Sequence, residues 1–138
     1  MLGLASDGFA ASTSTSTSTQ MNYNSFTEMP VWKDSLELSK KVFYLSQGLP
    51  RSEDYGLTSQ IRRSANSISA NLAEGFGRKS RKDKSHFYII SRGSAYETQS
   101  HILYGLGVEY FNEKESKEIV ALYNDLIFSL NKLIKSLS

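Results

Sequence analysis

The most distinctive chemistry in this sequence is a short run of basic side chains. Residues 77–84 read GRKSRKDK, with five basic residues and one acid in eight positions. The run follows glycines and precedes a segment of helical periodicity, so we expect a loop that leads into a helix. Side-chain cations beside the free backbone N–H groups of a helix N-terminus suit phosphate oxygens. The candidate nucleic-acid contacts are Arg78, Lys79, Arg81, Lys82 and Lys84.

The same basic run has a plainer interpretation. A charged loop between two helices can serve only to keep a protein in solution. The total charge does not decide the matter, because sixteen Lys and Arg against fourteen Asp and Glu give a net charge of only +2. Self-association would favour phosphate binding, since symmetry would gather several copies of the loop into one positive rim. Both interpretations stand at the level of the sequence.

Two glutamates, Glu74 and Glu97, lie in stretches rich in small and hydroxylated residues. The first interpretation is a structural polar network, in which Arg62 or Arg63 forms an ion pair with one of them and sets the register of two helices. The second is a carboxylate pair for acid–base or metal chemistry in a hydrolase or nuclease. The Glu-x-x-His spacing of di-iron helical bundles is absent, so we favour the structural network.

Other catalytic and metal-binding patterns are missing from the sequence. It has no cysteine, which excludes disulfides, thiolate catalysis and cysteine-based metal sites. Its two histidines, His86 and His101, lie fifteen residues apart, whereas a metal site needs several converging ligands. No Gly-x-Ser-x-Gly, Walker loop, His-Glu-x-x-His or dinucleotide fingerprint occurs. We therefore predict no metal, no cofactor and no enzymatic activity.

Length and hydropathy indicate one cytoplasmic domain. The 138 residues, 39% of them hydrophobic, have enough material for one core. No run of eighteen apolar residues exists, and the first residues lack the basic flank and long apolar stretch of a signal peptide. We predict a cytoplasmic protein without membrane contact.

The N-terminal residues differ in composition from the rest of the chain. Ser and Thr alternate strictly over residues 12–19, with no large apolar side chain to bury. We therefore expect residues 1–20 to be a disordered or appended peptide, followed by a lead-in over residues 21–29. A short addressing peptide on a flexible tether is the alternative.

From residue 30 onward, apolar residues recur at helical spacing in four segments. No segment alternates polar and apolar residues long enough to predict a strand, and the connections are short. Short connections make successive helices antiparallel neighbours, so we predict an all-α, antiparallel up-down-up-down four-helix bundle over residues 30–138. The predicted helices span about 30–47, 53–75, 80–108 and 113–137.

The third predicted helix carries two adjacent lines of large side chains at seven-residue spacing. One line is Tyr88, Ala95 and Ile102, and the other is Ile89, Tyr96, Leu103 and Tyr110. An apolar stripe this broad covers more than one neighbour. We therefore expect this helix to face both the bundle core and a second surface outside it, and the chain to form a homo-oligomer.

A series of short motifs in one order carries a family resemblance. The motifs are Val31-Trp32-Lys33, residues 55–64, Ser67-Ile68, Asn71, residues 73–75, Gly77-Arg78 and residues 93–97. Together they resemble the bacterial four-helix bundle proteins of the 23S rRNA intervening-sequence family, over Pro30 to about Leu137. Ser91 and Phe76 depart mildly from the family pattern, which more often has alanine and a small residue there.

The resemblance implies a left-handed bundle that assembles as a ring-like homopentamer, similar in shape to the accessory protein of diversity-generating retroelements. It implies no demonstrated activity, and RNA or DNA binding is the usual suggestion for such proteins. We therefore expect a non-enzymatic oligomer that binds nucleic acid, RNA above all, through the basic loop. The alternative is a protein-interaction scaffold whose ring docks a partner protein.

Overall fold

The computed structural model of this chain describes residues 23–138. The expectations for residues 1–20 and for the start of the lead-in lie outside the described residues. The described part is all-α, without a strand, and this confirms the predicted fold class. Its four long helices are α2 (Pro30–Ser46), α3 (Leu57–Phe76), α4 (Arg81–Gly107) and α5 (Glu113–Lys135). Two short 3-10 helices, η2 (Phe26–Glu28) and η3 (Arg51–Glu53), precede α2 and α3.

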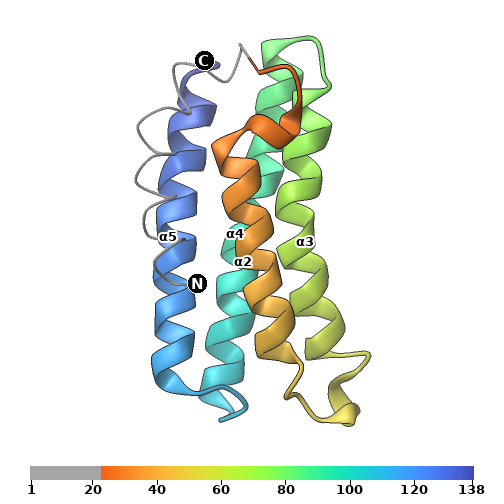
Figure 1. The fold of residues 1–138 in the computed structure, drawn as a ribbon, viewed down its shortest axis with the longest axis vertical. Coiled ribbons are helices and arrows are strands. Elements are labelled where there is room, and N and C mark those ends of the chain that lie inside the picture. Colours follow the sequence, from red (N-terminus) through yellow and green to blue (C-terminus); the bar gives the residue numbers. More distant parts are fainter. Residues whose placement is uncertain (1–22) are drawn as a thin grey trace.

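Successive helices run in opposite directions, each packed beside the next, with α5 returning to α2 (Figure 1). The hydrogen bonds between helices follow this order. Ser91 of α4 donates to the carbonyl oxygen of Ile68 in α3 at 2.7 Å. At one end of the bundle, Arg81 at the start of α4 donates to the carbonyl oxygen of Ser136, directly after α5, at 2.8 Å. No helix in the described part of the chain is long and apolar enough to cross a membrane.

Side-chain caps determine where the last two helices begin. The Ser80 hydroxyl accepts the Asp83 N–H at 3.0 Å, and the Asn112 amide oxygen accepts the Glu115 N–H at 2.8 Å. Helix α3 begins at residue 57, four residues later than predicted, because the chain first forms η3. The Glu53 carboxylate then accepts the Leu57 N–H at 3.0 Å, and this hydrogen bond lowers the pKa of that carboxyl.

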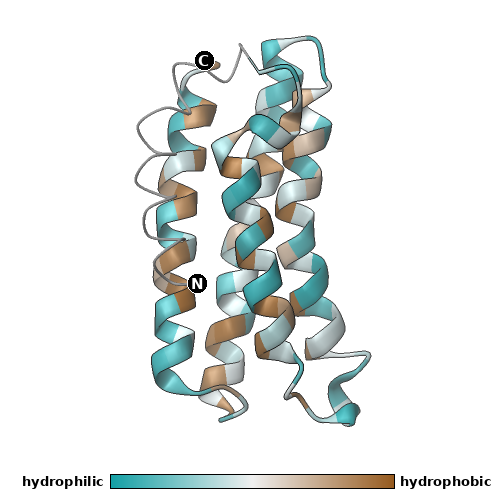
Figure 2. Ribbon diagram, in the orientation of Figure 1, coloured by the Kyte–Doolittle hydropathy of each residue, from teal (hydrophilic) through white to brown (hydrophobic). Residues whose placement is uncertain are grey.

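The two predicted lines of large side chains on α4 differ in burial. All three residues of the first line are fully buried in the core, whereas all four of the second are exposed, the last of them, Tyr110, lying beyond the end of α4. Figure 2 shows the corresponding alternation of hydrophilic and hydrophobic segments along the helices. The prediction that one line of this helix faces the bundle core is therefore confirmed. The second line faces outward and is available for a contact outside the bundle.

Helix α4 makes its most extensive contact with α3, and small polar side chains line this contact. The buried hydroxyls of Ser64 and Thr98 are hydrogen-bonded to each other at 2.8 Å. The buried Ser91 hydroxyl uses a backbone carbonyl of α3, as described above. Because each of these hydroxyls has a partner, the small-residue stretch allows close approach without leaving these groups unsatisfied.

Two tyrosines complete the core without a polar contact. The hydroxyls of Tyr88 and Tyr123 are buried and have no hydrogen-bond partner among the described residues. Burial raises the pKa of Tyr88 to about 12 and also raises the pKa of Tyr123. Both phenols therefore stay neutral at ordinary pH and act as packing groups.

Two glycines of α4 form a matched pair for a stability test. A Cβ at Gly105 would collide with the buried ring of Phe111, whereas a Cβ at Gly93 would meet no atom within 4 Å. We predict that Gly105→Ala lowers the free energy of unfolding by about 1–3 kcal/mol through overpacking. Gly93→Ala should raise it by roughly 0.5–1 kcal/mol, because alanine favours the helix. Chemical denaturation measures both, and a stabilising Gly105→Ala would contradict the packing described here.

Candidate nucleic-acid interface

The basic run lies at the end of the bundle where α3 ends and α4 begins, and the end of α5 is close by (Figure 1). Residues 77–80 form the connection, and the remaining basic residues belong to the first turn of α4. The predicted loop followed by a helix N-terminus is therefore present. Its five cations nevertheless fall into two groups with different surroundings.

Lys84 caps the C-terminal end of α3. Its ammonium donates to the carbonyl oxygen of Phe76 at 2.6 Å and approaches that of Gly75 at 3.5 Å. These carbonyls belong to the last turn of α3, where the helix dipole is negative. Partial burial lowers the pKa of Lys84. This lysine is therefore a helix cap and is not a free phosphate contact.

Arg81 and Arg78 also have partners within the protein. Arg81 caps the end of α5 through its hydrogen bond to Ser136. Arg78 forms an ion pair with Glu74 at 3.0 Å, and its guanidinium lies 4.7 Å from the centre of the Phe87 ring. Both arginines are exposed, so they retain donors toward solvent, but each is oriented by the bundle itself.

Lys79 and Lys82 form the second group. Both are exposed, and neither forms a hydrogen bond or an ion pair through its side chain with another described residue. They flank the Ser80 cap, so they lie beside the free N–H groups of the first turn of α4. Asp83 in the same turn offsets part of this positive potential. These two lysines are the cations of the basic run that have no side-chain partner in residues 23–138.

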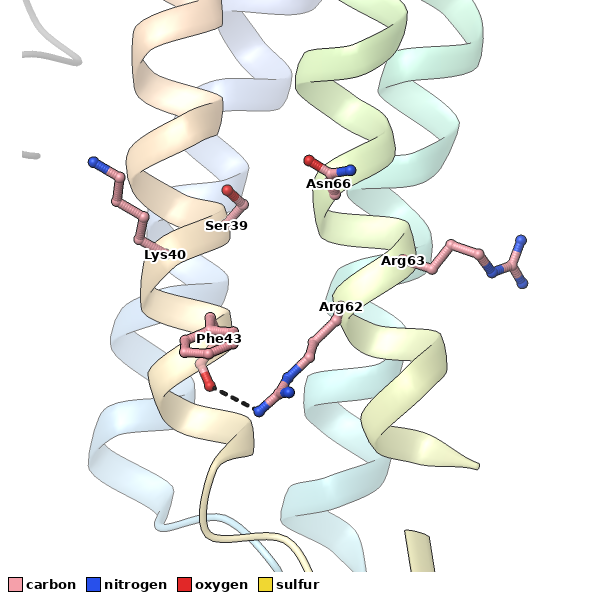
Figure 3. A pocket seen from close by; sticks show the side chains of 6 residues that line it. All are labelled: Ser39, Lys40, Phe43, Arg62, Arg63 and Asn66. Carbon is pink, nitrogen blue, oxygen red and sulfur yellow. Dashed lines mark hydrogen bonds between the residues drawn. The ribbon is translucent and has the colours of Figure 1, made fainter. Parts of the chain in front are cut away.

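The predicted cross-helix ion pair is wrong. Arg62 turns toward α2, where its Nε donates to the Ser46 hydroxyl at 2.7 Å and its Nη2 to the Phe43 carbonyl oxygen at 3.4 Å. Figure 3 shows Arg63 pointing away from the bundle. Glu97 instead approaches His101 on its own helix, with 3.4 Å between carboxylate oxygen and ring nitrogen.

The two glutamates do not form a carboxylate pair either. Glu97 is adjacent to Thr98, which contacts Ser64, and Ser64 lies ten residues before Glu74 in α3. Ten helical residues correspond to roughly 15 Å. In addition, no group of three or more acidic or histidine side chains in residues 23–138 is arranged to hold a metal ion. The geometry offers no support for the hydrolase or nuclease alternative.

The helices, their order and the small-residue contact between α3 and α4 agree with the motifs that carry the family resemblance. The model of the 23S rRNA-intervening sequence protein family matches residues 27–132. The chain belongs to this family. The match covers all four long helices except the last residues of α5. A comparison with curated proteins finds no match for this sequence.

A second basic surface was missed in the sequence. A groove of about 500 Å³ lies between α2 and α3, and Figure 3 shows its lining. Its residues are Ser39, Lys40, Phe43, Arg62, Arg63 and Asn66. Nothing in the sequence indicates this groove directly. The sequence-based interpretation places Phe43 in the buried apolar stripe of the helix predicted over residues 30–47, and Arg62 in the cross-helix ion pair. A helical wheel of α2 places Phe43 at the edge of that stripe, the one signal that it could be exposed.

We predict that Lys84→Ala lowers the free energy of unfolding by roughly 1–2 kcal/mol, because the last carbonyls of α3 lose a charged donor. Lys82→Ala is the matched control and should change the free energy of unfolding by less than about 0.5 kcal/mol. Urea denaturation followed by circular dichroism measures both. Equal effects of the two substitutions would contradict the capping role of Lys84.

Proposed function

We propose that this protein is a cytoplasmic, non-enzymatic homo-oligomer that binds RNA through the loop between α3 and α4. The observation that carries the proposal is the exposed, unpartnered state of Lys79 and Lys82 beside the α4 N-terminus. Side-chain cations and free backbone N–H groups together favour phosphate oxygens.

Self-association is the second part of the proposal, and the exposed line on α4 supports it. Ile89 is 44% exposed, Tyr96 53% and Leu103 51%, although each is a large apolar or aromatic residue. A continuous line of such residues on a monomer marks an interaction surface. Burial of this line against a second copy would remove it from water. A closed ring, a pentamer by the family resemblance, would bring several basic loops together.

The RNA proposal predicts a specific salt dependence. If each of the five basic residues of the run neutralised one phosphate, the log–log slope would be about −3.5 to −4.5 per protomer, and the two lysines without internal partners account for about 1.4–1.8 of that magnitude. Because Arg78, Arg81 and Lys84 have internal partners, we attribute the salt-dependent part of the RNA affinity to Lys79 and Lys82. The double variant Lys79→Gln/Lys82→Gln should bind an RNA hairpin more weakly and reduce the magnitude of the slope by about 1.4–1.8 per protomer. Fluorescence anisotropy at several salt concentrations measures it.

Lys114→Gln/Lys117→Gln is the matched control. These two lysines are exposed near the start of α5, at the opposite end of the bundle from the loop (Figure 1). The control removes the same charge and should leave the slope unchanged. If both double variants lose the same affinity, the binding is a response to net charge alone and the loop has no special role.

A protein-interaction scaffold is the second candidate function. The exposed apolar line on α4 favours it, because apolar side chains contribute little to phosphate binding and much to protein contacts. In this function the ring docks a partner protein and the basic loop is solvated. Capture of one stoichiometric protein, with no RNA binding by the purified oligomer, would favour the scaffold over the RNA-binding function.

The oligomer itself is tested by one substitution. Leu103→Glu should dissociate the assembly to the 15.5 kDa monomer, because a charge would be buried in the interface without a partner. Ala121→Glu is the control, at an exposed position of α5 outside the apolar line. Light scattering coupled to gel filtration gives the masses. A wild-type protein that is already monomeric would contradict self-association.

A further inference from the structure

The groove between α2 and α3 joins an aromatic ring to several cations at a place remote from the basic loop. We propose that this groove binds one nucleotide unit of a single-stranded nucleic acid, with the base against Phe43, its phosphate held by Arg62, and the flanking phosphates met by the outward-pointing cations of the rims. The inference rests on the proposed nucleic-acid binding and adds a second contact of a different kind. Its parts are an open ring, a fixed guanidinium and two charged rims.

Phe43 is the open ring. It is 41% exposed, although phenylalanine is among the residues most often buried. The Arg62 guanidinium lies 4.4 Å from its ring centre, and the Phe43 and Tyr44 rings pack nearly perpendicular, at 85°, with centroids 5.3 Å apart. These neighbours restrict the ring while leaving part of it open. A restricted aromatic side chain with open surface can stack with a nucleobase of any type.

Arg62 is the fixed guanidinium. It crosses from α3 toward α2 and donates to Ser46 and to the Phe43 carbonyl oxygen (Figure 3). These two contacts use two of the five N–H donors of a guanidinium. The other donors stay available in the groove, and the side chain is already ordered before a ligand arrives. A preorganised guanidinium is well suited to the oxygens of a phosphate.

Lys40 and Arg63 lie on opposite rims of the groove, one on each helix, and their charged ends point outward from it (Figure 3). Lys40 forms an ion pair with Glu37 at 3.1 Å, in which both side chains are well exposed, so the pair is weak and easily exchanged for a phosphate. Arg63 is exposed and forms no ion pair among the described residues. Arg62 is therefore the cation inside the groove, and Lys40 and Arg63 are placed to meet the phosphates on either side of the bound unit.

The lining favours a nucleic acid over a protein segment. An amphipathic helix that docks in a groove needs apolar contacts at successive turns, and Phe43 is the one apolar residue of this lining. The Ser39 hydroxyl donates to the Leu36 carbonyl oxygen at 2.7 Å and can still accept, and the Asn66 amide can donate and accept, so both suit base edges. A duplex keeps its bases stacked inside, so it cannot present one to the ring. A single strand can do so.

The groove and the basic loop can serve one strand. Arg63 lies thirteen residues before Phe76, the end of α3, which corresponds to roughly 20 Å along the helix, and Arg78 follows two residues later. The residues between them on the same side include Asn66 of the groove lining and Glu74, which Arg78 neutralises. A single-stranded segment that extends from a hairpin could therefore reach the groove while the hairpin contacts the loop.

The test compares two RNA probes of equal length, a single-stranded oligouridylate and a blunt hairpin, by fluorescence anisotropy. Phe43→Leu should weaken binding of the single strand roughly 5- to 150-fold through loss of stacking, and leave its salt slope unchanged. The same variant should bind the hairpin as the wild type does. Arg63→Gln should reduce the magnitude of the single-strand slope by about 0.7.

Phe128→Leu is the matched control, because Phe128 is an exposed phenylalanine of α5, at 54%, and does not line the groove. It should bind both probes normally. Circular dichroism checks the fold of each variant. If Phe43→Leu unfolds, Arg63→Gln still tests the groove, because Arg63 is exposed and its substitution should not disturb the core.

Three results would overturn the inference. If Phe43→Leu and Arg63→Gln bind the single strand normally while the Lys79→Gln/Lys82→Gln variant loses the hairpin, the groove is not a site and the proposed function stands. If Phe128→Leu weakens binding as much as Phe43→Leu, the contact is a general aromatic surface. If the wild type binds neither probe, the proposed function and this inference fail together.

Discussion

Small hydroxylated side chains allow α3 to lie against α4 along much of its length, and this contact determines which way every other side chain of α3 points. Two hydrogen bonds, one between the Ser64 and Thr98 hydroxyls and one from the Ser91 hydroxyl to the Ile68 carbonyl oxygen, hold the two helices at one rotation and one register. With Ser64 directed at α4, Arg62 must point toward α2 and Arg63 toward solvent. The same contact leaves the second apolar line of α4 on the outside.

Helix ends impose a second constraint, which acts on charge. The last carbonyls of a helix carry a partial negative charge and need donors. Lys84 meets this need for α3, and Arg81 meets it for α5. Cations that appear equivalent in a basic run therefore divide into those that stabilise the bundle and those that face solvent, here Lys79 and Lys82. Counting charges in the run overstates the charge available to a ligand.

Much of the fold was predictable because its causes are local. The caps at Ser80 and Asn112, the buried line on α4 and the four helices follow from side chains within a few residues of each other. The start of α3 was predicted four residues too early, at residue 53. Glu53 and Asp54 are acids of the kind that favour a helix start, but they precede the helix. Glu53 instead accepts from the helix across a preceding turn. The loop was predicted correctly, whereas the partners of its cations and the groove were not.

The sequence by itself determined that the chain forms amphipathic helices, where two of them begin, and the family to which it belongs, because periodicity, capping and motif order are properties of consecutive residues. Only the tertiary structure decided which neighbour each long polar side chain meets. Arg62 can reach in several directions from α3, and its choice of Ser46 and the Phe43 ring over a glutamate depends on how α3 is rotated between α2 and α4. That rotation arises from packing between segments distant in sequence, and no local pattern encodes it.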